Sequence, residues 1–500
     1  MPLTPFAIFK DFKNGDLDSS SAIELLITLI ENVENITTRL ESIDILEKVN
    51  LKNKRVFNTL ENLFISDSNE KIRCLSATVL KNLFSEEAIP PMNYALQHEK
   101  SLNCLIAIVS NLAEIHGEKA RSVLLKNFYE INKKKYKYNI KDLLEETDLN
   151  LLSNQELAEI LINYYVIFSL KLEFGYFKFE LNEKGAIINL DLSNVDYQGL
   201  GLSKLTNSFE SVLSLSFLKR LDLSNNHLKA IPENIKTLKF LDYLDLSYNN
   251  ISRLPETISS FNNLRTLNIK SNHLRYIPES IGLLSSLEVL ILRDNYLIKL
   301  PNSFSSLTSL KLLDLHHNKL ALIPTNFNNL TSLTELELGW NRILSVPESI
   351  RSLKSLEKLS IGRNQLKKVP IWIDSLKKLK VLYLYDNKLT NLPESIKFLT
   401  NLVELNLRNN QFNEIPDSLA SLKSLKILNL SWNNLNTLPD WIDSLSSLEQ
   451  LNLWGNKLKN LPESIVNLEN LKMLYLNFNK IVEFSDSLKS LKKKGVSIKI

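Results

Sequence analysis

The chain has 500 residues, of which 44% are hydrophobic and 23% charged, and its formal net charge is +4. This composition indicates a folded chain, excludes intrinsic disorder and shows no global preference for nucleic acid or anionic membranes. Two cysteines cannot form a disulfide framework, and Lys10 and Asp11 interrupt the N-terminal apolar segment before it could serve as a secretory signal, so we expect a cytoplasmic protein. The longest uncharged apolar stretch, between Glu159 and Lys171, is too short to predict a membrane span.

Residues 1–165 are expected to form a helical domain. Apolar residues such as Ile72 and Leu75 recur there with a period of about 3.6, which places them on one helical stripe. Capping boxes, in which a serine and a glutamate three positions later satisfy helix N–H groups, are predicted at Ser21–Glu24 and Ser153–Glu156. Short polar turns divide the region into helix pairs, for which we expect the segments 54–65 with 69–84 and 92–98 with 101–115.

One of these helices resembles a known repeat family. Residues 66–84, SDSNEKIRCLSATVLKNLF, are similar to the second helix of a HEAT repeat, and Asp67 and Arg73 stand where that family often has an acid and a base. This resemblance implies an all-α, HEAT-like helical-repeat domain. The following residues 166–186 alternate between apolar and polar, and we expect them to form a strand or hairpin that caps the next domain.

A second period governs the rest of the chain. Asparagine recurs every 23 residues, proline keeps the same interval from Pro232 to Pro462, and the unit reads LxxLxLxxNxLxxLPxxIxxLxx. This unit resembles the leucine-rich-repeat signature. The resemblance implies an α/β solenoid over 187–484, with about 13 coils and a parallel sheet on its concave face, and a C-terminal cap over 485–500. The asparagines expected to form a structural ladder are Asn226, Asn249, Asn272, Asn295, Asn318, Asn341, Asn364, Asn387, Asn410, Asn433, Asn456 and Asn479.

Each repeated position has a physical reason. Leu221 and Leu223 alternate with Arg220 and Asp222, which predicts a short strand with its leucines inward. An asparagine amide can satisfy the turning backbone between coils. Proline suits the first position of a helical turn, and an acid follows eight of the eleven repeat prolines, as the positive end of a short helix would prefer.

The 23-residue LPxxIxxL form resembles the intracellular Ras-group leucine-rich-repeat proteins, and it is also similar to the repeat domains of disease-resistance proteins. Ras-group proteins are scaffolds that bind small GTPases and protein phosphatases on the concave face. The nucleotide-binding module of the disease-resistance proteins is lacking, and a HEAT-like front end is not the usual Ras-group arrangement. The resemblance therefore implies a scaffold for a protein partner, with a small GTPase or a phosphatase as candidates.

The sequence offers no recognisable enzyme chemistry. Phosphate-loop, kinase, hydrolase and zinc-protease signatures do not occur, so we predict a non-enzymatic protein without a cofactor. Cys74 and Cys104 lie on apolar helical stripes, which favours core residues over a catalytic thiol. His316 and His317 follow Asp314, but no third nitrogen or sulfur ligand falls on the adjacent coils, so no metal site is predicted.

Two charged features have alternative interpretations. Glu335 and Glu337 next to Asp314 could form a catalytic carboxylate pair, but a solvated acidic patch is the simpler reading. The run NKKKYKYN, Asn132–Asn139, mixes lysine with tyrosine as a nucleic-acid site does. Residues 1–180 nevertheless carry a net charge of −5, against +9 for 181–500, so a solvated helix end is favoured and no nucleic-acid partner is predicted.

The outward strand positions are the remaining candidate site. They form columns along the inner wall of the solenoid, where exposed Trp, Tyr and Arg usually dominate protein–protein affinity. The alternative is that these rings only pack against neighbouring strands. We expect a folded protein to bind there, with a sensor for a peptide or small ligand as the alternative function. The candidate binding residues are Arg293, His316, His317, Glu337, Trp340, Arg363, Tyr383, Tyr385, Arg408, Trp432 and Trp454.

Overall fold

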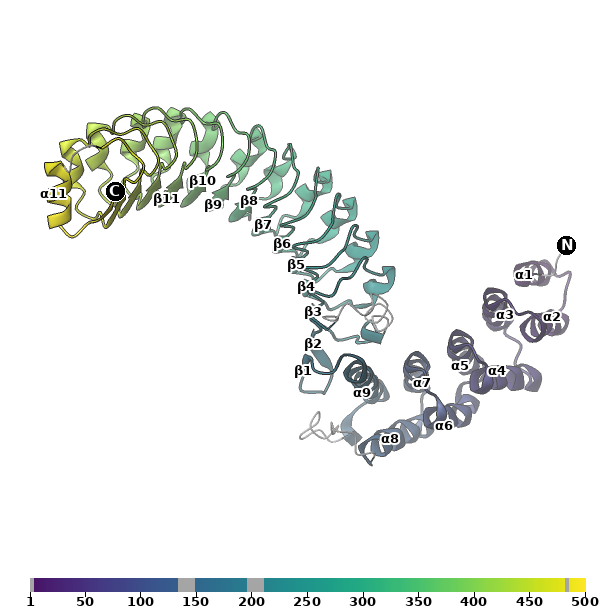
Figure 1. Ribbon diagram of the computed structural model, residues 1–500. Coiled ribbons are helices and arrows are strands. Elements are labelled where there is room, and N and C mark those ends of the chain that lie inside the picture. The colour runs from purple at the N-terminus through teal and green to yellow at the C-terminus, as the bar shows by residue number, and fades with distance from the viewer. Residues whose placement is uncertain (1–3, 134–148, 196–210, 482–484) are drawn as a thin grey trace. The chain divides into compact units, whose positions relative to one another are not determined.

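A computed structural model describes residues 4–133, 149–195, 211–481 and 485–500. The chain divides into two compact units, which are described separately (Figure 1). Unit 1 comprises Met1–Leu190 and Ser203–Leu218, and unit 2 comprises Asp191–Leu202 and Lys219–Ile500. All but the first two residues of the run Asn132–Asn139 lie outside the described residues, as does most of the insertion that follows Val195.

Unit 1 is a two-layer helical stack. Helices α3, α5, α7 and α9 pack against one another in succession, and α2, α4, α6 and α8 form the second layer (Figure 1). The helix pairs predicted over 54–84 and 92–115 are confirmed, with ends shifted by one to three residues. No described helix is long and apolar enough to cross a membrane. The helices are α1 (Pro5–Asn14), α2 (Ser19–Asn32), α3 (Ile36–Val49), α4 (Lys54–Ser66), α5 (Glu70–Phe84), η1 (Ser85–Ala88), α6 (Ile89–His98), α7 (Leu102–Glu114), α8 (Glu118–Lys133), η3 (Leu149–Leu151) and α9 (Asn154–Phe174).

Acid–base pairs connect successive helix pairs of this stack. Arg39 on α3 pairs with Asp67, which follows α4. Arg73 on α5 donates from two nitrogens to the two carboxylate oxygens of Glu99, at 2.8 and 3.0 Å. Arg73 also donates to the backbone carbonyl of Asp67 at 2.8 Å. The acid and base that the HEAT resemblance singled out therefore each bind a partner from a neighbouring helix pair, and Arg39 and Glu99 complete the set.

Two details of unit 1 differ from the predictions. The capping box at Ser153–Glu156 is confirmed, but the one at Ser21–Glu24 is wrong, because Asp18 caps α2 by accepting from the N–H groups of Ser20 and Ser21 at 2.8 and 3.0 Å. The strand or hairpin expected over 166–186 begins only after α9 has ended at Gly175, where φ is 76°. Apolar residues on every second position also suit a helix that is buried on most sides, and the capped start of α9 carries the helix through. The hairpin strands are β1 (Lys178–Leu181) and β2 (Ile187–Asp191).

Unit 2 is a curved solenoid of parallel strands in chain order (Figure 1). Each three-residue strand is followed by a turn and one turn of 3-10 helix on the convex side. The strands are β3 (Arg220–Asp222), β4 (Tyr243–Asp245), β5 (Thr266–Asn268), β6 (Val289–Ile291), β7 (Leu312–Asp314), β8 (Glu335–Glu337), β9 (Lys358–Ser360), β10 (Val381–Tyr383), β11 (Glu404–Asn406), β12 (Ile427–Asn429), β13 (Gln450–Asn452), β14 (Met473–Tyr475) and β15 (Ser497–Lys499). The 3-10 helices are η4 (Glu233–Thr237), η5 (Glu256–Ser260), η6 (Glu279–Leu283), η7 (Asn302–Ser306), η8 (Phe327–Asn329), η9 (Glu348–Ser352), η10 (Ile371–Ser375), η11 (Glu394–Phe398), η12 (Asp417–Ser421), η13 (Asp440–Ser444) and η14 (Glu463–Asn467).

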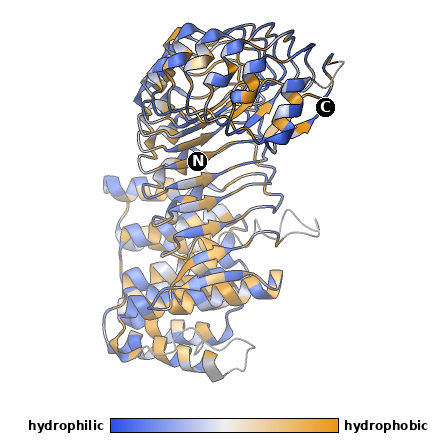
Figure 2. Ribbon diagram, turned by 90° about the vertical axis from the view of Figure 1, so that its left-hand side faces the viewer, coloured by the Kyte–Doolittle hydropathy of each residue, from blue (hydrophilic) through white to orange (hydrophobic). Residues whose placement is uncertain are grey.

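Leucine columns form the core of unit 2. Hydrophobic and hydrophilic residues both occur throughout the coils of unit 2 (Figure 2). The register of β3 on β4 places Leu221 beside Leu244, and both side chains are fully buried, whereas Arg220 is exposed. The alternation predicted for this strand is therefore confirmed. The repeat proline lies one position earlier than expected. Pro232, at φ −71° and ψ 149°, is the extended residue before η4, and Glu233 begins the helical turn.

The ladder asparagines join each coil to the one before it. The Nδ2 of Asn364 donates to the carbonyls of Leu338, Ile361 and Gly362 at 3.0 to 3.2 Å. Its Oδ1 accepts from the backbone N–H of Ile343 at 2.9 Å. One buried side chain thus binds four backbone groups from two coils, and without it the N–H of Ile343 would be buried with no partner.

The last coil is closed by α11 (Asp486–Lys493) and β15. Ser485, which replaces the repeat proline, caps α11 by accepting from the N–H of Leu488 at 3.4 Å. Leu488 and Leu491 are fully buried, while the basic residues of the helix are exposed. The apolar face of α11 covers the core, and β15 extends the sheet beside β14.

Candidate functional site

The concave face carries a column of strained residues. The residue before each ladder asparagine has a left-handed backbone conformation, with φ between 50° and 58° for the side-chain-bearing members and 69° for Gly455. Outside glycine and asparagine this conformation costs about 1–2 kcal/mol per residue. Asn194, which precedes Val195 in the first coil, has the same conformation and is counted with this set. We call the set the left-handed column; its members are Asn194, Asn225, Tyr248, Ser271, Asp294, His317, Trp340, Arg363, Asp386, Asn409, Trp432, Gly455 and Phe478.

Five consecutive members of the left-handed column contact one another. The Nδ1 of His317 donates to Asp294 Oδ1 at 2.7 Å, and the His317 ring meets Trp340 edge-on, 5.5 Å between centroids. The guanidinium of Arg363 lies 3.8 Å from the centre of the Trp340 ring. Arg363 Nε then donates to Asp386 Oδ2 at 2.8 Å. Cation–π and charge-assisted contacts thus hold Trp340 in one orientation while 40% of it stays exposed.

Glycines provide seats for neighbouring rings. A Cβ on Gly362 would lie 2.4 to 2.7 Å from three atoms of the Tyr385 ring. A Cβ on Gly339 would lie 2.8 Å from the ring of His316, and one on Gly455 would lie 2.9 Å from the ring of Trp432. In each case the missing side chain lets an aromatic ring of an adjacent coil lie directly on the backbone.

The later coils carry exposed aromatic rings with fewer charges. Trp454 stacks on Phe478, 5.9 Å between centroids and 11° between planes, and lies 6.5 Å from Trp432. Trp432 is 47% exposed and Phe478 73%. Trp432, Trp454 and Phe478 form a second aromatic cluster, which lies in the fourth to sixth coils after the coil of Trp340. Arg408 is exposed between the two clusters.

The acidic residues of the early and middle coils are partly buried. Burial raises the pKa of Asp314, and the charge of Glu337 adds to the effect. Glu337 itself pairs with Lys358 at 2.7 Å. Burial lowers the pKa of His316, and Arg293 acts in the same direction. His316 is thus neutral at pH 7, and no metal-binding group of three or more His, Cys, Asp or Glu residues exists among the residues that the structure describes.

The cysteines of unit 1 are free thiols. A hydrogen bond with Cys104, together with burial, raises the pKa of the Cys74 thiol. Cys104 is fully buried and donates to the Glu70 carbonyl at 3.3 Å. A protonated thiol is a poor nucleophile, which favours the packing role expected for Cys74. For Cys104 the full burial of the side chain favours the same role.

The structure brings some predicted site residues together and separates others. His317, Trp340 and Arg363 form one cluster, while Tyr383 and Tyr385 form another, 6.4 Å between rings. Trp432 and Trp454 belong to the later cluster. The residues that sequence reasoning left out are Asp294, Asp386, Phe478 and the seat glycines Gly339, Gly362 and Gly455. For Asp294 and Asp386 a signal was available, since Asp294, His317, Trp340, Arg363 and Asp386 are spaced by 23 residues.

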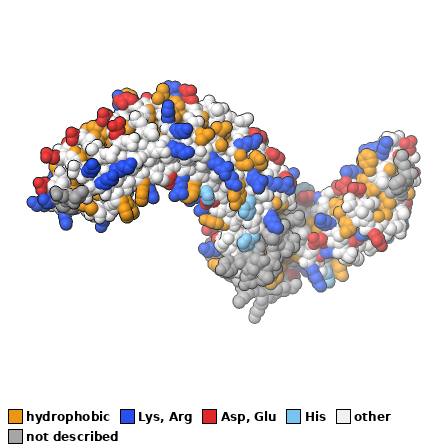
Figure 3. All heavy atoms as spheres, turned by 45° about the horizontal axis from the view of Figure 1, so that its top comes forward, with side chains coloured by type: hydrophobic (Ala, Val, Ile, Leu, Met, Phe, Trp, Pro, Cys, Tyr) orange, Lys and Arg blue, Asp and Glu red, His pale blue; other side chains and the backbone are white. Residues whose placement is uncertain are grey.

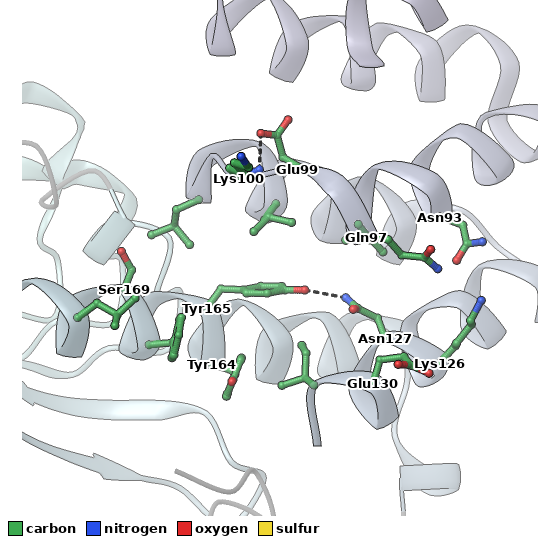
Figure 4. A pocket seen from close by; sticks show the side chains of 16 residues that line it. Asn93, Gln97, Glu99, Lys100, Lys126, Asn127, Glu130, Tyr164, Tyr165 and Ser169 are labelled. Carbon is green, nitrogen blue, oxygen red and sulfur yellow. Dashed lines mark hydrogen bonds between the residues drawn. The ribbon is translucent and has the colours of Figure 1, made fainter. Parts of the chain in front are cut away.

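Unit 1 contains a separate hollow of about 790 Å³ between α6, α7, α8 and α9 (Figure 4). Its wall combines apolar residues such as Leu96 and Phe168 with charged ones such as Lys100 and Glu130. Tyr165 crosses the hollow and accepts a hydrogen bond from Asn127 Nδ2 at 2.8 Å (Figure 4). Burial raises the pKa of this phenol.

Comparison with family models decides the assignment. A model described as "Leucine-rich repeat region" matches residues 256–342, 336–435 and 416–496, and one described as "Leucine rich repeat" matches 213–274. The chain belongs to the leucine-rich-repeat family. Among solved structures, this leucine-rich-repeat chain is similar to a leucine-rich-repeat protein of Leptospira interrogans, with 32% identity over 65% of this chain and 93% of that one and a TM-score of 0.50. A TDR receptor matches with 26% identity over 62% of this chain and 61% of that one, at the same TM-score.

A comparison with curated proteins gave no match. An internalin of Listeria monocytogenes shares 24% identity with the leucine-rich-repeat chain, over 59% of this chain and 94% of that one, with a TM-score of 0.49. The family models and the Leptospira structure confirm the leucine-rich-repeat family and the solenoid fold that the repeat implied.

Proposed function

We propose that this protein is a non-enzymatic scaffold that binds a folded protein partner on the concave face of its leucine-rich repeats, with a small GTPase or a phosphatase as the candidates that the Ras-group resemblance suggests. The observation that carries the proposal is the oriented, exposed Trp340 between His317 and Arg363. A large ring held in place before binding loses little conformational entropy on contact, which is a property of hot spots at protein interfaces. The expected cytoplasmic location belongs to the same proposal.

The sequence around Trp340 also suits a partner with mixed charge. Asp294 and Asp386 flank the cluster, and each already forms an ion pair, Asp294 with Arg293 and Asp386 with Arg363. A partner can exchange these pairs for its own without leaving a charge buried alone. Charge reversal at Arg363 would break this balance, because it would place a second carboxylate next to Asp386.

The test is affinity purification from the native host followed by mass spectrometry. We compare the wild type with the double variant Trp340→Ala and Arg363→Glu. Loss of two hot-spot residues should weaken capture of the concave-face partner by at least about thirtyfold, while the melting profile stays nearly unchanged. Capture at the wild-type level would remove the concave face from consideration.

A matched control exists on the convex side. Phe398 is 49% exposed and Lys397 lies 5.4 Å above its ring, so the pair repeats the chemistry of Trp340 and Arg363 away from the concave face. The variant Phe398→Ala with Lys397→Glu should capture the same partner as the wild type. Loss of capture in both variants would indicate general damage to the solenoid.

A second candidate is a sensor that binds a peptide in the later coils. The stacked Trp454 and Phe478 favour it, because exposed parallel rings form a platform for a flexible ligand. Trp454→Ala should then abolish thermal stabilisation by peptides, whereas the Trp340 variant should not. Dependence of all binding on Trp340 would exclude the sensor.

A further inference from the structure

One edge of unit 2 is strongly basic. The exposed positions one, three and four residues after each ladder asparagine, from His227 to Lys480, form what we call the asparagine edge. Within the described residues this edge holds a single acid, Glu414. Its cations are Lys229, Arg253, Arg275, Lys299, Lys319, Arg342, Lys367, Lys368, Lys388, Lys457, Lys459 and Lys480. All are exposed, and no salt bridge joins any of them to another described residue.

The opposite edge, where the strands begin, has the same kinds of residue in a different arrangement. Glu288 pairs there with Lys311 at 2.6 Å and with Arg265 at 3.3 Å, and Glu449 pairs with Lys426 and Lys472 at 3.1 and 2.5 Å. If the cations reflected only a lysine-rich composition, acids would be expected to pair with them equally often on both edges. In Figure 3, Lys and Arg side chains lie in a broken row across one face of unit 2, with hydrophobic side chains between them, while acidic side chains gather along the convex rim.

Backbone hydrogen bonds make the asparagine edge continuous. The N–H of Lys319 donates to the carbonyl of Leu297 at 2.9 Å, and the N–H of Arg342 donates to that of Leu320 at 2.9 Å. The same bond recurs in coil after coil. Side chains at equal positions are therefore neighbours along the edge.

Apolar side chains interrupt the cations in four successive coils. Tyr276 is 55% exposed, Tyr296 42%, Ile298 47%, Leu322 70% and Leu344 58%. Each of these coils also has one cation on the edge and no acid. The amine of Lys319 lies 4.7 Å from the centre of the Tyr296 ring. The aliphatic stem of this lysine can therefore cover the ring while its charge stays in solvent.

We propose that the asparagine edge is a docking surface for anionic lipid membranes. Tyrosines suit the headgroup level, exposed aliphatic side chains suit the acyl boundary, and each lysine or arginine near an anionic surface contributes about 1 kcal/mol. A nucleic acid would use the cations but gain nothing from Ile298, Leu322 and Leu344. An acidic protein would favour a compact patch, whereas these cations run in a narrow line through ten of the twelve coils.

The test uses the full chain with vesicles of phosphatidylcholine, with or without phosphatidylserine. The wild type should cosediment with the phosphatidylserine vesicles only, and less so as the salt concentration rises. The variant Lys319→Glu with Arg342→Glu should lose at least about thirtyfold in partition coefficient. Lys239→Glu with Lys378→Glu, on the exposed segments that lead into β4 and β10, makes the same change of net charge and should bind like the wild type.

A second pair of variants tests the apolar contribution. Leu322→Ser with Leu344→Ser should weaken vesicle binding by about tenfold, because two aliphatic side chains no longer reach the lipid. Leu283→Ser, at a leucine that is 66% exposed on η6, should have no effect. All seven substituted positions of the vesicle experiments are at the surface, so the melting temperature should not change in any of these variants.

Several outcomes would overturn the proposal. They are absence of vesicle binding by the wild type, equal binding to phosphatidylcholine alone, and wild-type binding by the charge-reversed variant. Retention of an oligouridine in place of vesicles would assign the edge to nucleic acid and also reject the lipid. The Trp340 and Arg363 variant should bind vesicles normally, so this proposal and the concave-face proposal fail separately.

Discussion

Arg363 and Asn364 are neighbours in the chain and in the turn, but the left-handed column and the asparagine ladder follow opposite rules. Asn364 is 8% exposed and satisfies four backbone groups, so only an amide fits its position. Arg363 is exposed and makes its contacts through its side chain. Its φ of 51° is a left-handed conformation, which costs energy for most residues that carry a Cβ. The ladder fixes the coil, while the column can vary because the coil does not depend on its side chains.

The largest effect should come from the ladder. Asn364→Ala removes four hydrogen bonds and leaves the buried N–H of Ile343 without a partner, although the three carbonyls each keep one other donor. We expect a loss of about 3–5 kcal/mol in the free energy of unfolding. Urea denaturation followed by tryptophan fluorescence measures it. Asn436→Ala, at an exposed asparagine outside the ladder, should change the stability by less than about 0.5 kcal/mol. Equal losses in the two variants would contradict the division between ladder and surface.

The seat glycines sharpen the comparison. Gly362→Ala places a Cβ against the ring of Tyr385, so we expect a loss of about 1–3 kcal/mol in the free energy of unfolding. Tyr385→Ala removes the obstacle, and the double variant should be more stable than the sum of the single losses predicts. A double-mutant cycle measured by urea denaturation tests this coupling, and strict additivity would show that the ring does not rest on the glycine.

A smaller effect is expected at Trp340, whose φ is 55°, where glycine should be a more stable replacement than alanine, the reverse of the usual order. Because glycine adopts this conformation without strain, Trp340→Gly should be more stable than Trp340→Ala by up to about 1 kcal/mol. Trp441 in η13 provides the control, since glycine should there be the less stable replacement. Thermal denaturation of the four variants gives the two differences, and the same order at both sites would argue against backbone strain in the column.

The smallest effect depends on pH. Burial and the charge of Glu337 raise the pKa of Asp314 in the folded state, so the folded protein holds the proton of this carboxyl more tightly than the unfolded chain does. The folded protein therefore loses stability as the pH rises from the unfolded pKa to the folded pKa of this group. Asp314→Asn keeps an acceptor for the N–H of His316, which now lies at 2.9 Å, and should be more stable than the wild type at pH 7, by less than about 1 kcal/mol. The difference should vanish at pH values below about 4.

Asp294 provides the opposite case. In spite of its burial, the hydrogen bond from His317 and the charge of Arg293 hold the pKa of Asp294 below its usual value. Asp294→Asn should therefore lower the stability at pH 7, and this loss should shrink as the pH falls through the folded pKa. Unfolding curves of both variants across pH 3–7 test the two signs, and a common sign would contradict the assigned environments.

The sequence predicts the ladder better than it predicts the column. Asn226 and its successors repeat without variation, because backbone geometry demands one side chain, and the number of coils follows from them. The column has no such rule. Trp340 could be named as a candidate from its outward position, but its contacts with His317 and Arg363 depend on ring orientations that packing decides. Gly362 looked featureless in the sequence, since its role is visible only once Tyr385 is in place.

The total charge conceals the charge of the asparagine edge for a similar reason. The net charge of +4 suggested no preference for anionic surfaces, because acids on the convex turns and paired acids such as Glu288 and Glu449 offset the cations. Sorting residues by their offset from the ladder asparagine, rather than by sequence segment, separates the two edges. For helix α9 the limit was different, because a period of two over 166–174 suits both a strand and a helix buried on most sides.

The reach of the ladder bonds has a consequence for how such a chain can change in length. Asn364 bonds only its own coil and the coil before it, and every later ladder asparagine does the same. Deletion or duplication of 23 consecutive residues therefore rejoins equivalent bonds, whatever the starting point within the coil. Unequal recombination between coils can shorten or lengthen the array in whole steps without a new stabilising device, and each step shifts which side chains stand side by side on the inner wall.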